Sequence, residues 1–140
     1  MAATHGGRAH DRRPRARIAA RVTIVGTVTE VAPAIEAIAR RFNIPISIDT
    51  SKAKVAEAAI NCGAEIINDV SGLRFDALIA EIAAKYGAGL ILMNLRGDFE
   101  TMHRQKPVED IMSEVCQGFS RSIEKARSYG VKKEQIALDV

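Results

Sequence analysis

The 140-residue sequence predicts an α/β fold in which parallel strands alternate with helices. Short apolar runs alternate along the chain with segments whose apolar residues recur at three- and four-residue intervals. The apolar runs are continuous, which is typical of parallel strands covered on both faces. Each connection is long enough for the crossover helix that two parallel neighbours require. This alternation alone does not distinguish an open sheet from part of a closed barrel.

The composition narrows the class of protein. Apolar residues make up 47% of the chain and aromatic residues only 4%, so we expect an aliphatic core. Cys62 and Cys116 show neither C-x-x-C nor C-x-H spacing, and we expect small buried hydrophobic residues rather than a disulfide or zinc site. The sequence contains no run of eighteen apolar residues and no apolar signal segment, so we expect a cytoplasmic protein without a membrane segment.

Residues 1–30 form a basic leader. Its arginines are Arg8, Arg12, Arg13, Arg15, Arg17 and Arg21. A nucleic-acid-binding arm is one interpretation of this cluster. No aromatic residue lies among the arginines and no known binding module follows, so we favour a solvated segment that is disordered or not homologous to the rest of the chain's family, and we do not expect nucleic acid as a partner. The run VTIVGTV (22–28) is compatible with one strand.

The first half of the remaining chain predicts a helix, a strand, a helix and a strand. Apolar residues at helical intervals over 31–42 describe one helix face, and Pro33 is tolerated because it lies in the first turn. Residues 45–50 form a β-branched run too short for a helix. The Ala-, Glu- and Lys-rich segment 52–62 predicts the next helix, which Gly63 ends. The second apolar run, 64–69, follows.

The second half repeats the pattern. We expect a helix over 76–86 that stops at Gly87, a strand over 89–94 and a long polar loop that extends to Lys106. Pro107 fits the start of another helix, whose apolar stripe continues to Gly130. Residues 136–140 form the last predicted strand.

A polar residue ends each predicted strand after the leader: Asp49, Asn68 with Asp69, Asn94, and Asp139. A single Asp or Asn at such a position commonly caps the next helix or begins a turn. Several at one edge of a parallel sheet favour a polar pocket, and carboxylate and amide oxygens there accept hydrogen bonds from a flat, nitrogen-rich ligand.

Other catalytic and metal-binding patterns are absent from the sequence. It contains neither of the glycine-rich phosphate-binding motifs nor the G-x-S-x-G motif of one class of hydrolases. His5, His10 and His103 lack the spacing of metal ligands, so we assign no metal-binding residue.

Three segments together resemble a known family. They are ISIDTSKAKVAEAAINCGAEIINDVSGL at 46–73, LILMNLRG at 90–97 followed by Thr101 and Met102, and IALDV at 136–140. With the helix over 31–42 they are similar to the dihydropteroate synthase family of the pterin-binding superfamily. The resemblance implies that residues 31–140 are part of a pterin-binding domain with a (β/α)8 fold, whose ligand lies at the carboxyl ends of the strands.

The resemblance also implies a reaction and roles for four residues. Enzymes of this family join p-aminobenzoate to 6-hydroxymethyl-7,8-dihydropterin diphosphate and release pyrophosphate with the help of Mg2+. Asp49 corresponds to the aspartate that stabilises the cationic pterin, and Asn68 to the asparagine that hydrogen-bonds the ring. Asp139 corresponds to the aspartate that accepts hydrogen bonds from the amino-pyrimidine edge, and Met93 to an apolar wall of the pocket.

This chain departs from the family pattern in several places. Asn94 stands where the family usually has His, and the family's first strand with its metal-binding region has no counterpart in this sequence. The later lysine and arginine, and the part through which the family usually dimerises, would follow Val140. We therefore expect a partial barrel that folds poorly and lacks activity by itself. The alternatives are a folate-dependent methyltransferase domain of the same superfamily and a non-catalytic pterin- or nucleic-acid-binding module.

Overall fold

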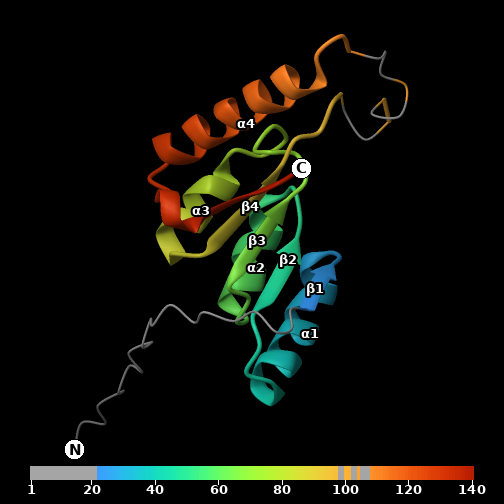
Figure 1. Cartoon of the computed structure of the whole chain (residues 1–140). Helices are drawn as coiled ribbons and strands as arrows, with labels where there is room; N and C mark the ends of the chain where they lie inside the picture. Colours follow the sequence, from blue (N-terminus) through green and yellow to red (C-terminus); the bar gives the residue numbers. More distant parts are fainter. Residues whose placement is uncertain (1–21, 98–99, 102–103, 105–107) are drawn as a thin grey trace, which may run out of the picture.

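The computed structural model describes residues 22–97, 100–101, 104 and 108–140. In this part of the chain five strands alternate with four α-helices (Figure 1). The strands are β1 (Val22–Val25), β2 (Ile46–Asp49), β3 (Ile66–Asp69), β4 (Gly89–Met93) and β5 (Ile136–Asp139), and the helices are α1 (Val28–Arg41), α2 (Ala53–Asn61), α3 (Leu78–Tyr86) and α4 (Ile111–Ser128). A short 3-10 helix, η2 (Lys133–Gln135), precedes β5.

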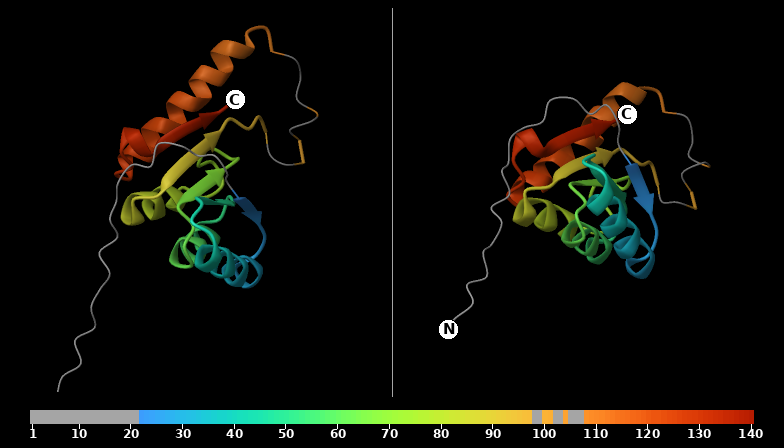
Figure 2. Two further views of the ribbon diagram at one scale, coloured as in Figure 1. Left: turned by 60° about the horizontal axis from the view of Figure 1, so that its bottom comes forward. Right: turned by 90° about the horizontal axis from the view of Figure 1, so that it is seen from below.

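The strands form one sheet in the order β1-β2-β3-β4-β5, and every neighbouring pair is parallel. Parallel neighbours joined by a crossover are almost always connected with the same hand, which places successive helices on the same face of the sheet. Figure 2 shows the helices along one side of the curved sheet. This is the arrangement of one sector of a (β/α)8 barrel, so the predicted fold class is confirmed.

The hydrophobic core lies between the sheet and the helices. Ile48, Ile67 and Leu90 are register neighbours on β2, β3 and β4, and none of them is exposed to solvent. Small residues of the helices, such as Ala59 and Ala83, pack with them in the same cluster and let the helices approach the sheet closely. As predicted, the core is aliphatic.

The opposite side of the sheet, which we call the inner face, carries alternate strand residues that point away from the helices. Val25 at the end of β1 lies on this face and is 73% exposed. The carboxyl ends of the five parallel strands all meet at one edge of the sheet. Exposure is uneven on the inner face, because Ser47 of β2 is fully buried there.

The N-terminal part of the fold differs from the prediction. β1 begins at Val22 and α1 at Val28, so the boundary predicted at residue 30 falls inside a helix. The helix starts early because Glu30 folds back on Thr27, whose backbone N–H donates to Glu30 Oε2 at 2.9 Å. Residues 1–21, with His5, His10 and the arginines of the leader, lie outside the described residues.

The last helix begins later than predicted. α4 starts at Ile111 because the side chain of Asp110 accepts a hydrogen bond from Ser113 N at 3.0 Å and so caps the first turn. Pro107, the predicted start, lies outside the described residues, as does His103. The predicted stop at Gly87 is confirmed by its left-handed φ of 65°.

Candidate functional site

Four residues predicted to bind the ligand lie on the inner face at the carboxyl ends of the strands. Asp49 of β2 is the register partner of Asn68 of β3, and Met93 of β4 is the partner of Asp139 of β5. Asn68 also pairs with Ile91, two residues before Met93 on the same strand. Because alternate residues share one face, all four side chains leave the sheet on the same side.

Asp49 and Asn68 form the centre of this group. Asn68 Nδ2 donates a long hydrogen bond of 3.4 Å to Asp49 Oδ2. Asn68 Oδ1 is buried and has no hydrogen-bond partner among the described residues. An unpaired buried acceptor costs about 1–3 kcal/mol, and a ligand N–H group can recover that energy. The pair thus presents a carboxylate and an amide carbonyl that accept hydrogen bonds.

Asp139 and Met93 extend the group toward the edge of the sheet. Asp139 is exposed on the edge strand β5, and Met93 lies half-buried on β4. Two strand spacings of about 4.8 Å each separate the Asn68 and Asp139 strands. A flat bicyclic ring with polar groups at both ends can bridge that distance, with the soft thioether of Met93 against its apolar part.

Asp69 does not belong to this group, although it follows Asn68 in the sequence. It points to the helix side, is fully buried, and accepts hydrogen bonds from Ser71 N, Ser71 Oγ and Leu73 N at 2.9, 2.7 and 2.7 Å. Burial raises the pKa of the Asp69 carboxyl, and these hydrogen bonds oppose the rise. The residue holds the loop after β3, where Leu73 adopts a left-handed φ of 66°.

Asn94, another strand-end residue of the prediction, also lies outside the group. Its amide packs directly against Gly118 of α4, so closely that a Cβ built on Gly118 would lie 2.7 Å from Asn94 Cγ. The side chain therefore faces the helix. At this position, where the family resemblance leads us to expect His, Asn94 contacts α4.

The described residues offer no obvious metal site. No group of three or more His, Cys, Asp or Glu side chains in the part of the chain that the structure describes is arranged to hold an ion. At the centre of the inner-face group, Asp49 supplies one carboxylate, and its hydrogen-bond partner Asn68 supplies an amide and no second negative charge. These residues do not fit a Mg2+ site by themselves.

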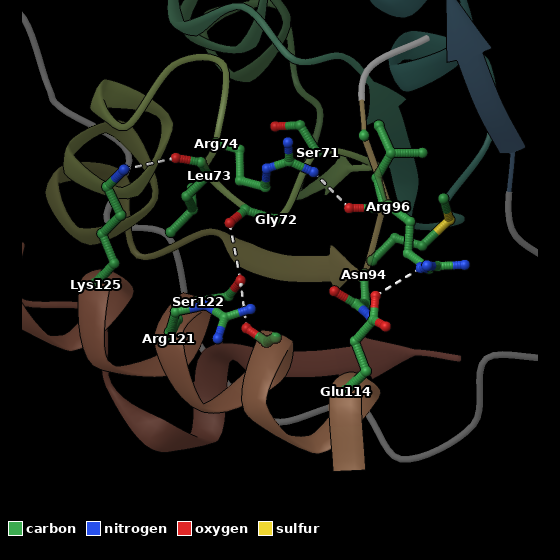
Figure 3. A pocket seen from close by; sticks show the side chains of 14 residues that line it. Ser71, Gly72, Leu73, Arg74, Asn94, Arg96, Glu114, Arg121, Ser122 and Lys125 are labelled. Carbon is green, nitrogen blue, oxygen red and sulfur yellow. Dashed lines mark hydrogen bonds and ion pairs between the residues drawn. The ribbon is translucent and has the colours of Figure 1, made fainter. Parts of the chain in front are cut away.

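A second polar region was missed by the sequence analysis. A cavity of about 500 Å³ opens on the helix side, between the loop after β3, the segment after β4 and α4 (Figure 3). Cationic side chains such as Arg74, Arg121 and Lys125 line it. The four-residue spacing of Arg121 and Lys125 on one helix was the available sequence signal.

In the described residues, no helix combines the length and apolar character that crossing a membrane requires.

Comparison with known proteins identifies the family. The family described as "Pterin binding enzyme" matches residues 9–140. Dihydropteroate synthase of Synechocystis is 44% identical over 107 residues, which are 76% of this chain and 37% of that protein.

Solved structures support the same assignment. The Yersinia pestis dihydropteroate synthase in complex with a sulfonamide drug superposes with a TM-score of 0.80 at 30% identity, covering 85% of this chain and 47% of that one. The Clostridium difficile dihydropteroate synthase, solved in the presence of pteroic acid, gives a TM-score of 0.72 at 41% identity, covering 80% and 40%. This chain thus spans less than half the length of these relatives. The fold, the strand-end motifs and the match over residues 9–140 show that the chain belongs to the pterin-binding enzyme family.

Proposed function

We propose that the inner-face residues form part of a pterin pocket and that the chain is part of a dihydropteroate synthase. Such an enzyme joins p-aminobenzoate to a dihydropterin methyl diphosphate and releases pyrophosphate. The observation that carries this proposal is the Asp49–Asn68 pair, in which a buried amide oxygen lacks a partner among the described residues and lies beside a carboxylate. A pterin ring offers the N–H donors that these acceptors require.

Each residue has a distinct role in this proposal. The carboxylate of Asp139 accepts two N–H hydrogen bonds from the amino-pyrimidine edge, and Asn68 Oδ1 accepts one from the ring. The carbon–oxygen bond to the diphosphate breaks and the leaving group takes the electron pair, which leaves a cationic methylene on the pterin. Asp49 stabilises this cation until the amine of p-aminobenzoate attacks, forms the new carbon–nitrogen bond and loses a proton.

Mg2+ enters the proposal only through the family. A bound magnesium ion would neutralise the charge of the departing diphosphate. Since the described residues do not fit a magnesium site, we assign no ligand and no step to the ion. We place the reaction in the cytoplasm, as for other enzymes that act on soluble metabolites.

Pterin binding by the full chain tests the proposal. We expect Asn68→Ala and Asp139→Asn each to weaken the binding of 6-hydroxymethylpterin at least tenfold, because each change removes a hydrogen-bond acceptor, or the charge of one, at the ring. Ligand fluorescence gives the dissociation constants, and circular dichroism checks that the variants retain their secondary structure. The matched controls Asn61→Ala, at the exposed end of α2, and Glu134→Gln, in η2, should bind as the wild type does. Equal affinity in all five proteins would contradict the proposal.

Binding and turnover are separate expectations. The inner face of the described strands carries no Arg or Lys that could hold the diphosphate. We therefore expect the isolated chain to bind pterin without measurable transfer to p-aminobenzoate, and chromatographic detection of dihydropteroate would contradict this.

A further inference from the structure

The cavity on the helix side lies beside the inner-face site and has Met93 in common with it. Its walls are the loop after β3 (residues 71–74), the segment after β4 (residues 94–97) with Met93, and the face of α4 that carries residues 114–125. Neither Asp49, Asn68 nor Asp139 lines it. With a volume of about 500 Å³ it lies within the range of small-molecule sites.

The charges in this cavity are mostly positive. Four cationic side chains line it: Arg74, Arg96, Arg121 and Lys125. The single carboxylate among the lining residues, Glu114, is already paired with Arg96, whose Nε lies 2.6 Å from Glu114 Oε1. In the part of the chain that the structure describes, the pocket therefore retains three positive charges without a lining carboxylate of their own.

The hydrogen-bond donors of these three side chains exceed the acceptors that the walls provide. Arg74 donates to Leu95 O, and Lys125 Nζ donates to Leu73 O at 2.8 Å. Arg121 makes no hydrogen bond or ion pair with any residue that the structure describes. A guanidinium has five donors and an ammonium three, so most of the donors remain available to a ligand.

A hydrogen bond joins two walls of the cavity, although the side chains of Arg121 and Lys125 are themselves exposed. Ser122 Oγ of α4 donates to Gly72 O at 2.9 Å across the cavity, which ties the loop after β3 to the helix. Figure 3 shows Arg74 on the wall opposite Arg121 and Lys125, which both rise from α4. Arg121 and Lys125 are four residues apart, and like charges at that spacing destabilise a helix unless something binds them.

We propose that this cavity binds a small phosphorylated ligand through Arg74, Arg121 and Lys125. Guanidinium groups pair with phosphate oxygens through two parallel hydrogen bonds, and an ammonium adds a mobile point charge. Two cationic walls facing each other suit a ligand with two phosphate groups better than one with a single phosphate. Met93 lines this cavity and also belongs to the inner-face group. The second site still does not depend on the pterin proposal, because Arg74, Arg121 and Lys125 have no role in that proposal.

Inorganic diphosphate is the probe that tests the second site. A ligand that binds only the folded protein raises the ratio of folded to unfolded chain, by about elevenfold at a ligand concentration ten times the dissociation constant. Urea unfolding of the full chain, followed by circular dichroism at several millimolar concentrations of diphosphate, measures this ratio even where the chain is only marginally stable. Sodium chloride at matched ionic strength measures the general effect of salt.

Charge-removing variants of the same chain give the expected pattern. Arg121→Gln and Lys125→Gln should each weaken diphosphate binding about tenfold, while Arg127→Gln on another side of α4 serves as the matched control and should bind as the wild type does. Asp49→Asn should leave diphosphate binding unchanged, because it lies in the other site. A shift that sodium chloride reproduces, or one that is equal in the wild type, Arg121→Gln and Arg127→Gln, would overturn the proposal.

Discussion

At the scale of single residues, the direction of each side chain separates the candidate site from the scaffold. Asn68 and Asp69 are consecutive, yet one faces the open side of the sheet and the other is fully buried under the helices. The alternation of a strand produces this division. Asn68 has a side-chain oxygen without a hydrogen-bond partner among the described residues, whereas both carboxylate oxygens of Asp69 accept hydrogen bonds from the loop after β3. Of these two consecutive residues, Asn68 is therefore the candidate for ligand binding and Asp69 stabilises the fold.

Gly72 is a residue at which any side chain should be costly. Its φ is 59°, and a Cβ there would lie 2.6 Å from Met93 O, a backbone atom that cannot turn away. We expect Gly72→Ala to lower the free energy of unfolding by about 2–4 kcal/mol, the sum of left-handed strain and overpacking. Gly89→Ala is the matched control, because its nearest contact would be 3.5 Å and its φ is not in the left-handed region. Urea unfolding of both variants measures the difference, and equal losses would contradict the prediction.

Asp69 should give stability an unusual dependence on pH. Burial raises the pKa of the Asp69 carboxyl in the folded protein above the ordinary value of 3.8. Between pH 3.8 and this raised pKa, the folded protein therefore holds the proton more tightly than the unfolded chain does. The contribution of Asp69 to the free energy of unfolding is therefore greatest below pH 3.8 and falls as pH rises through the raised pKa. The other acidic residues titrate alike in the wild type and in Asp69→Asn, so their effect on the free energy of unfolding cancels when the two proteins are compared.

Urea midpoints of the wild type and Asp69→Asn at a series of acidic pH values measure this effect. We expect the stability of the wild type relative to the variant to decrease as pH rises. A relative stability that is constant or increases with pH would show that the buried carboxyl is not the cause.

The sequence was sufficient to place some site residues and insufficient for others, for physical reasons. Asp49 and Asn68 were placed together because parallel neighbours align their carboxyl ends, which is a local consequence of strand and crossover pattern. Asn94 was misplaced because it lies just beyond β4, where the loop sets the side-chain direction. The cationic cavity joins Arg74 to Arg121, and only the packing of α4 against the loop after β3 reveals it.

At the scale of elements, the ends of helices were predicted more reliably than their starts. Gly87 ends α3 through its own backbone conformation, which is a property of one residue. The start of α1 depends on a reciprocal contact between Thr27 and Glu30, and the start of α4 depends on the cap at Asp110. Each cap joins two residues three positions apart, and pairs of these residue types are common throughout the sequence. The sequence alone therefore did not single out Asp110 as the cap, and Pro107 was predicted as the helix start instead.

The contact between Asn94 and α4 should couple two substitutions. Ala is favoured over Gly inside a helix by about 1 kcal/mol, but a Cβ at Gly118 would push into the amide of Asn94. We expect Gly118→Ala to stabilise the Asn94→Ala protein and to destabilise the wild type, with a coupling energy of about 1–2 kcal/mol. The four proteins of this double-mutant cycle are compared by urea unfolding. Additive effects would show that the two residues do not constrain each other.

At the scale of the whole molecule, one side of the sheet is packed against helices, and the other carries exposed residues at both of its edges. The helices bury the aliphatic core on one face, while Val25 and Asp139 remain exposed on the inner face. The two edge strands, β1 and β5, each have one side without a hydrogen-bonded neighbour in the described sheet. Exposed strand edges are sites at which chains pair with each other. These unpaired strand edges therefore favour self-association of the chain.

The edge at β5 offers a direct test of this consequence. Leu138 is 43% exposed on the edge strand, and a lysine on an exposed edge opposes pairing between chains because the charge would have to be desolvated. We expect the purified wild-type chain to associate at micromolar concentrations and Leu138→Lys to increase the monomer fraction several-fold, as sedimentation velocity measures. Met112→Lys adds the same charge on α4, where the side chain is 64% exposed, and should leave association nearly unchanged. A wild-type chain that remains monomeric, or an equal response of both variants, would show that the β5 edge does not drive association.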